Sequence, residues 1–185
     1  MLQNLAKLLA AGVAGVFVVG SGFALVQELV KDYTLQSLAQ NDISLEQAVL
    51  VAQGALDACK KNNSAVTVAV VDRVGGIRFA IRGDGAPADD VDVARKKAYT
   101  ARTFRQATSA WIERTAPDAV DAKGQLVNLT GQRQLENTIA RAGGLLIIWH
   151  GDAIGGVGVT GSKGGDTMDE DCAMAGTQAI ADQLL

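Results

Sequence analysis

The sequence has little of the side-chain chemistry on which most enzymes rely. Its 185 residues include one histidine, His150, and two cysteines, and no group of His and Cys has the spacing of a zinc site. No serine lies in a GxSxG motif and no second histidine exists, so the residues of a catalytic triad are missing. These absences argue against a self-sufficient hydrolase or a metal-catalytic centre.

The sequence also lacks an excess of positive charge. Lys and Arg number 17 against 20 Asp and Glu, for a formal net charge of −3. Non-specific nucleic-acid binding requires a basic surface, so this balance argues against a nucleic-acid partner. One local basic cluster lies on a predicted helix, where it is expected to form a solvated face, with a ligand-facing subset as the alternative: Arg95, Lys96, Lys97, Arg102 and Arg105.

Apolar residues, by contrast, are plentiful at 48%, although only 4% of the residues are aromatic. Residues 8–26 form an uncharged apolar run, which predicts either a signal peptide cleaved after Ala24 or an uncleaved membrane anchor within residues 1–26. Residues 27–43 are polar with spaced leucines and are interpreted as a tether. Both alternatives place the remaining domain, residues 44–185, in the periplasm or outside the cell, in the first case free and in the second anchored to the inner membrane.

Hydrophobic periodicity in residues 44–185 predicts an α+β fold, in which helices pack on an antiparallel sheet of about five strands. Ser44 and Gln47 form a capping box at the start of the first helix, and Thr167 with Glu170 suggests another at the start of the last. The predicted helices cover 44–61, 89–112, 132–142 and 167–184, and the predicted strands cover 65–72, 77–81, 125–130, 145–149 and 154–160.

Two features of these elements have competing interpretations. Gly156, Gly158 and Gly161 match GxGxxG, but they lie within or at the end of a strand rather than before a helix, so a dinucleotide site is rejected. Gly156, Gly158 and Thr160 share one face of the strand, where we expect a helix, or else a flat ligand, to approach closely. Cys59 and Cys172 fall on apolar helix faces, which predicts buried, reduced thiols even though export permits a disulfide.

Several blocks of sequence, in the same order along the chain, resemble the GlcG/HbpS-like family. They span about residues 43–185 and read ISLEQA, TVAVVDRVGG, RGDGAP, DVARKKAYTARTF, IGGVGVTGS and DEDCAMAG. That family includes extracellular haem-binding proteins and the C-terminal domain of some cobalamin adenosyltransferases. The resemblance implies a compact α/β unit that self-associates and binds haem or a related tetrapyrrole.

The resemblance also implies a pocket near the RGDGAP loop and the KKAYTA helix, with the matching residues Arg82, Asp84, Lys97, Thr100 and Thr103. Convergence of Arg82 and Lys97 would suit a carboxylate, such as a haem propionate or a small acid. Substituting either cation by alanine is therefore expected to weaken ligand binding without lowering stability. No histidine lies in this region to serve as a strong axial ligand for haem iron.

The favoured function is that of an extracytoplasmic, non-catalytic binding protein for a small planar or anionic ligand. The cofactor is unknown, with haem or another tetrapyrrole as the candidate, and we expect a homo-oligomer. The main alternative is an accessory subunit of a periplasmic or membrane-bound dehydrogenase complex, docked through residues 1–40 and 126–143. A third hypothesis is an enzyme that uses Lys97 or Asp84 as a base.

Overall fold

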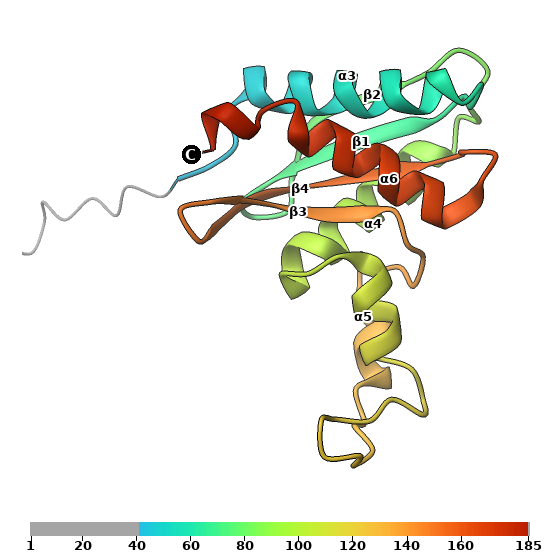
Figure 1. Cartoon of the computed structure of the whole chain (residues 1–185), viewed down its shortest axis with the longest axis vertical. Coiled ribbons are helices and arrows are strands. Elements are labelled where there is room, and N and C mark those ends of the chain that lie inside the picture. The colour runs from blue at the N-terminus through green and yellow to red at the C-terminus, as the bar shows by residue number, and fades with distance from the viewer. Residues whose placement is uncertain (1–40, 185) are drawn as a thin grey trace, which may run out of the picture. The chain divides into compact units, whose positions relative to one another are not determined.

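The computed structural model describes residues 41–184, which form a four-stranded antiparallel sheet with helices on both faces (Figure 1). The predicted signal peptide or anchor, and most of the predicted tether, lie outside these residues. Among the residues that are described, no helix is long and apolar enough to cross a membrane. The strands are β1 (Thr67–Asp72), β2 (Ile77–Arg82), β3 (Gly144–Trp149) and β4 (Asp152–Thr160), and the α-helices are α3 (Leu45–Lys61), α4 (Asp90–Phe104), α5 (Thr108–Arg114) and α6 (Gly165–Gln178).

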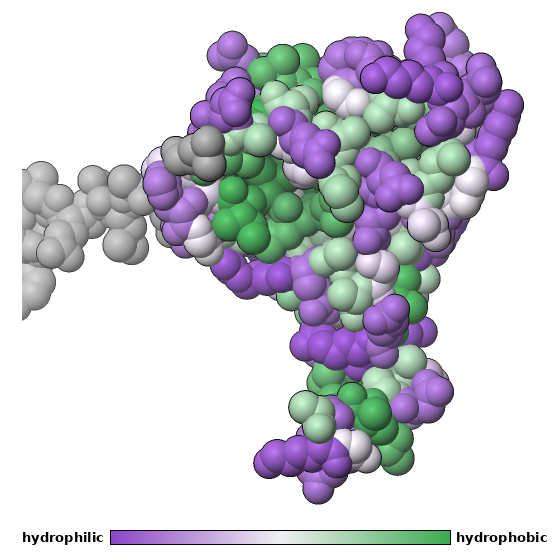
Figure 2. Space-filling view, in the orientation of Figure 1, coloured by the Kyte–Doolittle hydropathy of each residue, from purple (hydrophilic) through white to green (hydrophobic). Residues whose placement is uncertain are grey.

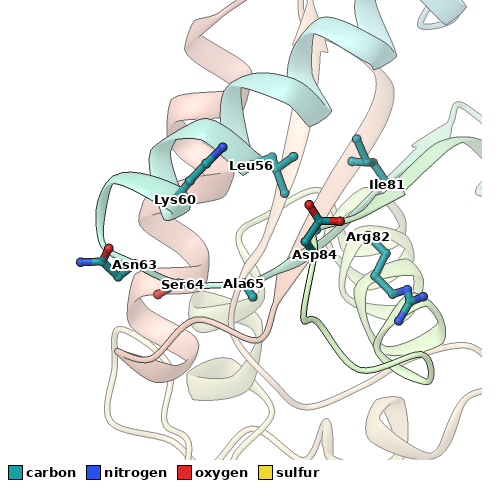
Figure 3. A pocket seen from close by; sticks show the side chains of 9 residues that line it. Leu56, Lys60, Asn63, Ser64, Ala65, Ile81, Arg82 and Asp84 are labelled. Carbon is teal, nitrogen blue, oxygen red and sulfur yellow. The ribbon is translucent and has the colours of Figure 1, made fainter.

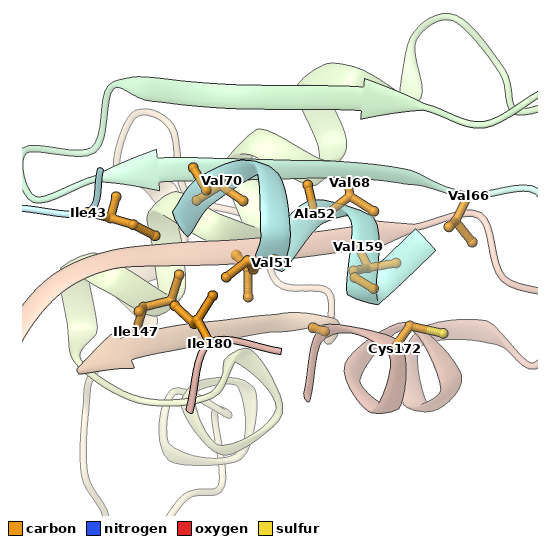
Figure 4. Close-up of a cluster of buried hydrophobic side chains, with 14 of the residues drawn as sticks. Ile43, Val51, Ala52, Val66, Val68, Val70, Ile147, Val159, Cys172 and Ile180 are labelled. Carbon is orange, nitrogen blue, oxygen red and sulfur yellow. The ribbon is translucent and has the colours of Figure 1, made fainter. Parts of the chain in front are cut away.

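The sheet consists of two hairpins, β1–β2 and β3–β4, joined through β1 and β4 in the order β2-β1-β4-β3. The apolar β1 lies in the interior of the sheet, as its continuous run of β-branched residues predicts. Helices α3 and α6 cover one face and α4 covers the other. The main core lies under α3 and α6, where Val51, Val68, Val159 and Ile180 pack together (Figure 4).

The expectation of about five strands is wrong by one. Residues 125–130 form no strand, and this region has only an isolated bridge between Val120 and Leu126. The predicted helix 132–142 is likewise wrong, because only the 3-10 turn η1 (Thr130–Gln134) forms. We call residues 115–139 the arm. It extends away from the sheet (Figure 1), so its apolar residues have no core face to pack against.

The ends of the helices also differ in part from the predictions. The capping box of Ser44 and Gln47 is confirmed. The predicted helix 89–112 is broken after Phe104, since Arg105 takes a left-handed conformation with φ 54° before α5 begins. The last helix starts at Gly165 without a side-chain cap, so the capping box predicted at Thr167 is wrong.

The glycines of β4 allow α4 to lie directly against the strand. A Cβ atom on Gly156 would lie 2.5 Å from the carbonyl oxygen of Ala98, and one on Gly158 would overlap the carbonyl oxygen of Ala94. The close approach of a helix is therefore confirmed. A flat ligand has no room on this face, because the backbone of α4 fills it.

The prediction of reduced cysteines is wrong. Cys59 of α3 and Cys172 of α6 form a disulfide across 113 residues of sequence, with their Cα atoms 5.5 Å apart. Both residues are buried, as predicted. The inward faces of α3 and α6 pack against each other through small residues, since a Cβ on Gly176 would meet the carbonyl oxygen of Val51 at 2.5 Å. This close packing brings the two thiols together.

We predict that Gly158→Ala lowers the free energy of unfolding by about 2–3 kcal/mol, because the new methyl group must displace α4. Gly131→Ala is the matched control. A Cβ there meets nothing within 4 Å, so its effect should stay within about 0.5 kcal/mol. Urea unfolding of both variants measures the difference, and equal stabilities would show that α4 does not lie on β4 as described.

The disulfide predicts that reduction raises the intact mass by two hydrogen atoms and lowers the free energy of unfolding by about 2–4 kcal/mol. A double variant, Cys59→Ala with Cys172→Ala, supplies the control. Its stability should be the same with and without reductant. The disulfide would be excluded if reductant changed the free energy of unfolding equally in the unmodified chain and the double variant. It would also be excluded if reduction left the mass of the unmodified chain unchanged.

Candidate functional site

A cleft of about 470 Å³ lies where the C-terminal end of α3 meets the end of β2 (Figure 3). Small-molecule sites in proteins usually have volumes of about 300–1,000 Å³. The residues that line the cleft come from α3, from the turn that follows it and from the end of β2: Leu56, Lys60, Asn63, Ser64, Ala65, Ile81, Arg82, Gly83 and Asp84.

The β1–β2 hairpin brings the two walls of the cleft together. Thr67 at the start of β1 pairs with Arg82 at the end of β2, so the chain entering β1 runs beside the chain leaving β2. The Gly83 amide donates to the Val66 carbonyl at 2.9 Å and extends this contact. On the α3 side, Asn63 reverses the chain with a φ of 53° directly after the helix.

The cleft combines apolar walls with charged side chains. Leu56 and Ile81 supply apolar surface, and Lys60 and Asp84 lie on opposite walls (Figure 3). Arg82 instead extends away from them, and its Nη1 donates to the Ala86 carbonyl at 2.8 Å. Arg82 therefore holds the loop that carries Asp84, while Lys60 presents a cation beside the apolar walls.

Of the five residues predicted to form the site, the cleft contains only Arg82 and Asp84. Thr100 is buried on α4, where its hydroxyl donates to the Lys96 carbonyl at 2.7 Å and accepts from the Ile139 amide at 3.0 Å. Thr103 is exposed on the same helix. These residues do not line the cleft because α4 covers the opposite face of the sheet from α3.

Lys97 is fully buried, so the expected convergence of Lys97 with Arg82 is wrong. Its Nζ donates to the Asp169 carboxylate at 2.8 Å, the Val159 carbonyl at 3.0 Å and the Asp166 carboxylate at 3.2 Å. An ammonium group has three donors, so none remains for a ligand. The second oxygen of Asp169 accepts from the Ser162 amide at 2.9 Å. This buried pair joins α4, β4 and α6.

The other cations of α4 fit the predicted solvated face. Lys96 and Arg95 both contact the Asp92 carboxylate, at 2.8 and 2.7 Å. The hydrogen bond from Lys96, and to a smaller extent the one from Arg95, lowers the pKa of the Asp92 carboxyl group. A second hollow near this helix is lined by Asp89, Asp92 and Arg95. Because Arg95 already contacts the Asp92 carboxylate, the charges of this hollow do not favour an anion.

Lys60 and the turn at 63–65 line the cleft but were not among the residues expected from the sequence. Lys60 resembles an ordinary basic residue in the last turn of a helix, where it complements the helix dipole. The connection between the elements could have identified Lys60 as a residue of the cleft. An antiparallel β1–β2 hairpin necessarily places the end of the preceding helix beside the RGDGAP loop.

We predict that Lys97→Met lowers the free energy of unfolding by about 3–5 kcal/mol, because it leaves the buried Asp169 carboxylate without its cation. The neighbouring Lys96→Met is the control, with an expected change within about 1 kcal/mol since it removes a surface ion pair. Thermal and urea unfolding measure both. Normal stability of Lys97→Met, combined with lost ligand binding, would instead support the role first expected of Lys97.

Comparison with known proteins supports the assignment of the fold. Residues 43–178 match the family model described as haem degrading protein HbpS-like. A Citrobacter freundii protein, named as an uncharacterized 15.0 kDa protein in the dhaT-dhaS intergenic region, is 33% identical over 135 residues, which cover 73% of this chain and 88% of that protein.

Two solved structures share the fold. A double mutant of HbpS from Streptomyces reticuli is 31% identical with a TM-score of 0.68, over 77% of this chain and 89% of that one. PduOC, crystallised as a haem complex, is 24% identical with a TM-score of 0.65, over 76% and 96% of the two chains. The resemblance noted in the sequence is confirmed: this chain belongs to the HbpS-like family.

Proposed function

We propose that this domain is a non-catalytic binding protein for a small organic molecule that carries a carboxylate, and that the ligand lies in the cleft between α3 and β2. The observation that carries the proposal is the position of Lys60. It lies beside the apolar Leu56 and Ile81, and among residues 41–184 it forms no salt bridge. A cation beside apolar walls suits an amphiphilic anion.

The family name raises the question of whether this cleft suits haem. Haem iron is usually held by His, Cys, Met or Tyr, and the residues lining the cleft include none of these. His150 lies at the turn between β3 and β4, and the two cysteines are bound to each other. The cleft therefore suits the carboxylates and one flank of a tetrapyrrole but does not suit its iron. The proposed ligand class is organic acids, tetrapyrroles included, without a requirement for metal.

The side chains near the cleft support binding rather than catalysis. Lys97, one of the two candidate bases, is buried and fully engaged. The hydroxyl of Ser64 accepts from the Lys163 amide at 3.1 Å and donates to the Met168 sulfur at 3.8 Å. Asp84 is exposed on a loop, and no lining residue could act as a nucleophile activated by histidine.

We further propose that the domain works outside the cytoplasm. The disulfide supports this location, because structural disulfides persist in oxidising compartments. The apolar run at residues 8–26 supports it as well.

The arm favours the alternative role of an accessory subunit. Its exposed apolar side chains are Val120, Leu126 and Leu135. Figure 2 shows this apolar surface on the part that extends from the body. Exposed apolar groups on a protrusion are typical of contact with another protein. Ligand binding and a docked arm are compatible, since the cleft and the arm lie on different elements.

The proposal predicts that iron-free protoporphyrin IX and haem bind with similar affinity, because the cleft contacts the carboxylates and not the iron. Lys60→Ala should weaken binding by about 1.5–3 kcal/mol, roughly a 10- to 150-fold rise in Kd. Asp84→Asn should strengthen binding by removing a like charge. Absorbance titrations of the two porphyrins, and calorimetry with lactate and succinate, measure these effects.

Lys61→Ala is the matched control, since Lys61 is the adjacent exposed lysine and does not line the cleft. The Lys61→Ala variant should bind the porphyrins and the small acids with the same affinity as the unmodified chain. Equal losses in both lysine variants would indicate only general charge attraction. Failure of every porphyrin and acid to bind would reject the proposed function.

A further inference from the structure

The cleft between α3 and β2 carries a second charge that the binding of a simple acid leaves unmatched. Asp84 lies on the wall opposite Lys60 (Figure 3), and among residues 41–184 neither side chain forms an ion pair. The neighbouring Arg82 does not pair with Asp84 either, since its guanidinium group donates to the Ala86 carbonyl. A ligand whose only charge is a carboxylate would therefore meet a cation on one wall and a like charge on the other.

The surface between these two charges is apolar. Leu56 and Ile81 line the cleft and are half-buried, because each also packs against the main core. A Cβ atom on Gly83 would lie 3.2 Å from Cδ1 of Leu56, so the chain leaving β2 packs directly against the side chain of α3. The apolar surface thus joins the two walls, while Lys60 and Asp84 are both exposed at their edges.

The lining hydroxyl group does not alter this arrangement of charges. The Ser64 hydroxyl accepts from the Lys163 amide at 3.1 Å and donates to the Met168 sulfur at 3.8 Å, so its donor and one acceptor position are already used. The charges that the cleft offers to a ligand are therefore one ammonium group and one carboxylate, on opposite sides of an apolar surface.

We propose that the cleft selects a zwitterion with an apolar side chain, of which the apolar α-amino acids are the simplest. This inference rests on the proposed function and narrows its ligand class. The ligand carboxylate accepts from the Lys60 ammonium group, and the ligand ammonium group donates to the Asp84 carboxylate. The apolar side chain of the ligand lies against Leu56 and Ile81.

The physical reason for this selectivity is that a bound ligand covers both charges of the cleft. A zwitterion supplies a partner for each of them, so neither charge loses water without gaining a hydrogen bond. A molecule with the same apolar group and only one charge leaves the other charge of the cleft without a partner. Selectivity therefore comes as much from the cost of the wrong ligand as from the contacts of the right one.

The test compares leucine with two analogues that each lack one of its charges. Isocaproate is leucine without the ammonium group, and isoamylamine is leucine without the carboxylate. Calorimetric titration of the full chain should show that leucine binds about 10-fold more tightly than either analogue. Asp84→Asn should weaken leucine binding by about 10-fold and yet strengthen isocaproate binding, whereas Lys60→Met should weaken both.

Asp57→Asn is the matched control, because Asp57 is an exposed acid of α3 that does not line the cleft. It should leave the affinities for leucine and isocaproate unchanged. Equal weakening of leucine binding by Asp57→Asn and Asp84→Asn would overturn the proposal, since it would indicate only a general effect of charge.

Two further outcomes would overturn the zwitterion proposal and leave the proposed function standing. In one, isocaproate binds as tightly as leucine and Asp84→Asn strengthens the binding of both. In the other, iron-free protoporphyrin IX binds and leucine does not. Failure of leucine, isocaproate and protoporphyrin IX alike to bind would reject the proposed function and this inference together.

Discussion

The backbone of α4 lies directly on Gly156 and Gly158 of β4, and the positions of several other elements depend on this contact. No side chain separates helix from strand, so the carbonyl groups of Ala94 and Ala98 meet the strand itself. The same approach brings Lys97 against Val159 and the two aspartates of α6. A lysine buried so completely requires its partners, because an unpaired charge is costly to remove from water. The glycines and the ion pair together join α4 to β4 and α6, two consecutive elements that lie far from α4 in the sequence.

This arrangement leaves the two faces of the sheet with different roles. Where α4 crosses β4, its face of the sheet is filled by backbone and by a satisfied ion pair, so no ligand fits against the β4 glycines. The opposite face is covered by α3 and α6, which the disulfide joins near the end of α3. Leu56 and Lys60, on either side of Cys59 in α3, line the cleft, and the cross-link therefore helps to hold one wall of the proposed site. The other wall is held by the hydrogen bond from Arg82 to Ala86.

Most of the sheet and of the helices that cover it could be predicted from the sequence, because apolar periodicity marks each packed element. The arm could not, since residues 125–142 have an apolar pattern but no core face to pack against. The break at Arg105 could not be predicted either, for a different reason. The apolar stripe of α4 continues into α5, so the sequence pattern resembles that of one longer helix. Two of the residues that line the cleft were among those expected to bind a ligand. Arg82 and Asp84 follow from the RGDGAP loop, whereas Lys60 depends on which helix end lies beside that loop.

Lys97 shows why a motif alone does not identify a binding residue. Its place at the margin of a small-residue stripe fits both a pocket and a buried ion pair, and only the position of Asp169 on α6 distinguishes them. The cysteines are a similar case, since an inward helix position fits both a thiol and a disulfide. In both cases the deciding partner lies more than 70 residues away in sequence.

The central claim is that the ligand occupies the cleft between α3 and β2. Mapping the amide chemical shifts of the full chain during titration with iron-free protoporphyrin IX tests this claim most directly. The account predicts that the largest changes fall at Leu56, Lys60, Ala65 and Ile81 and saturate together. Changes centred on Thr100 and Thr103 of α4, or on His150, with the cleft unaffected, would contradict it.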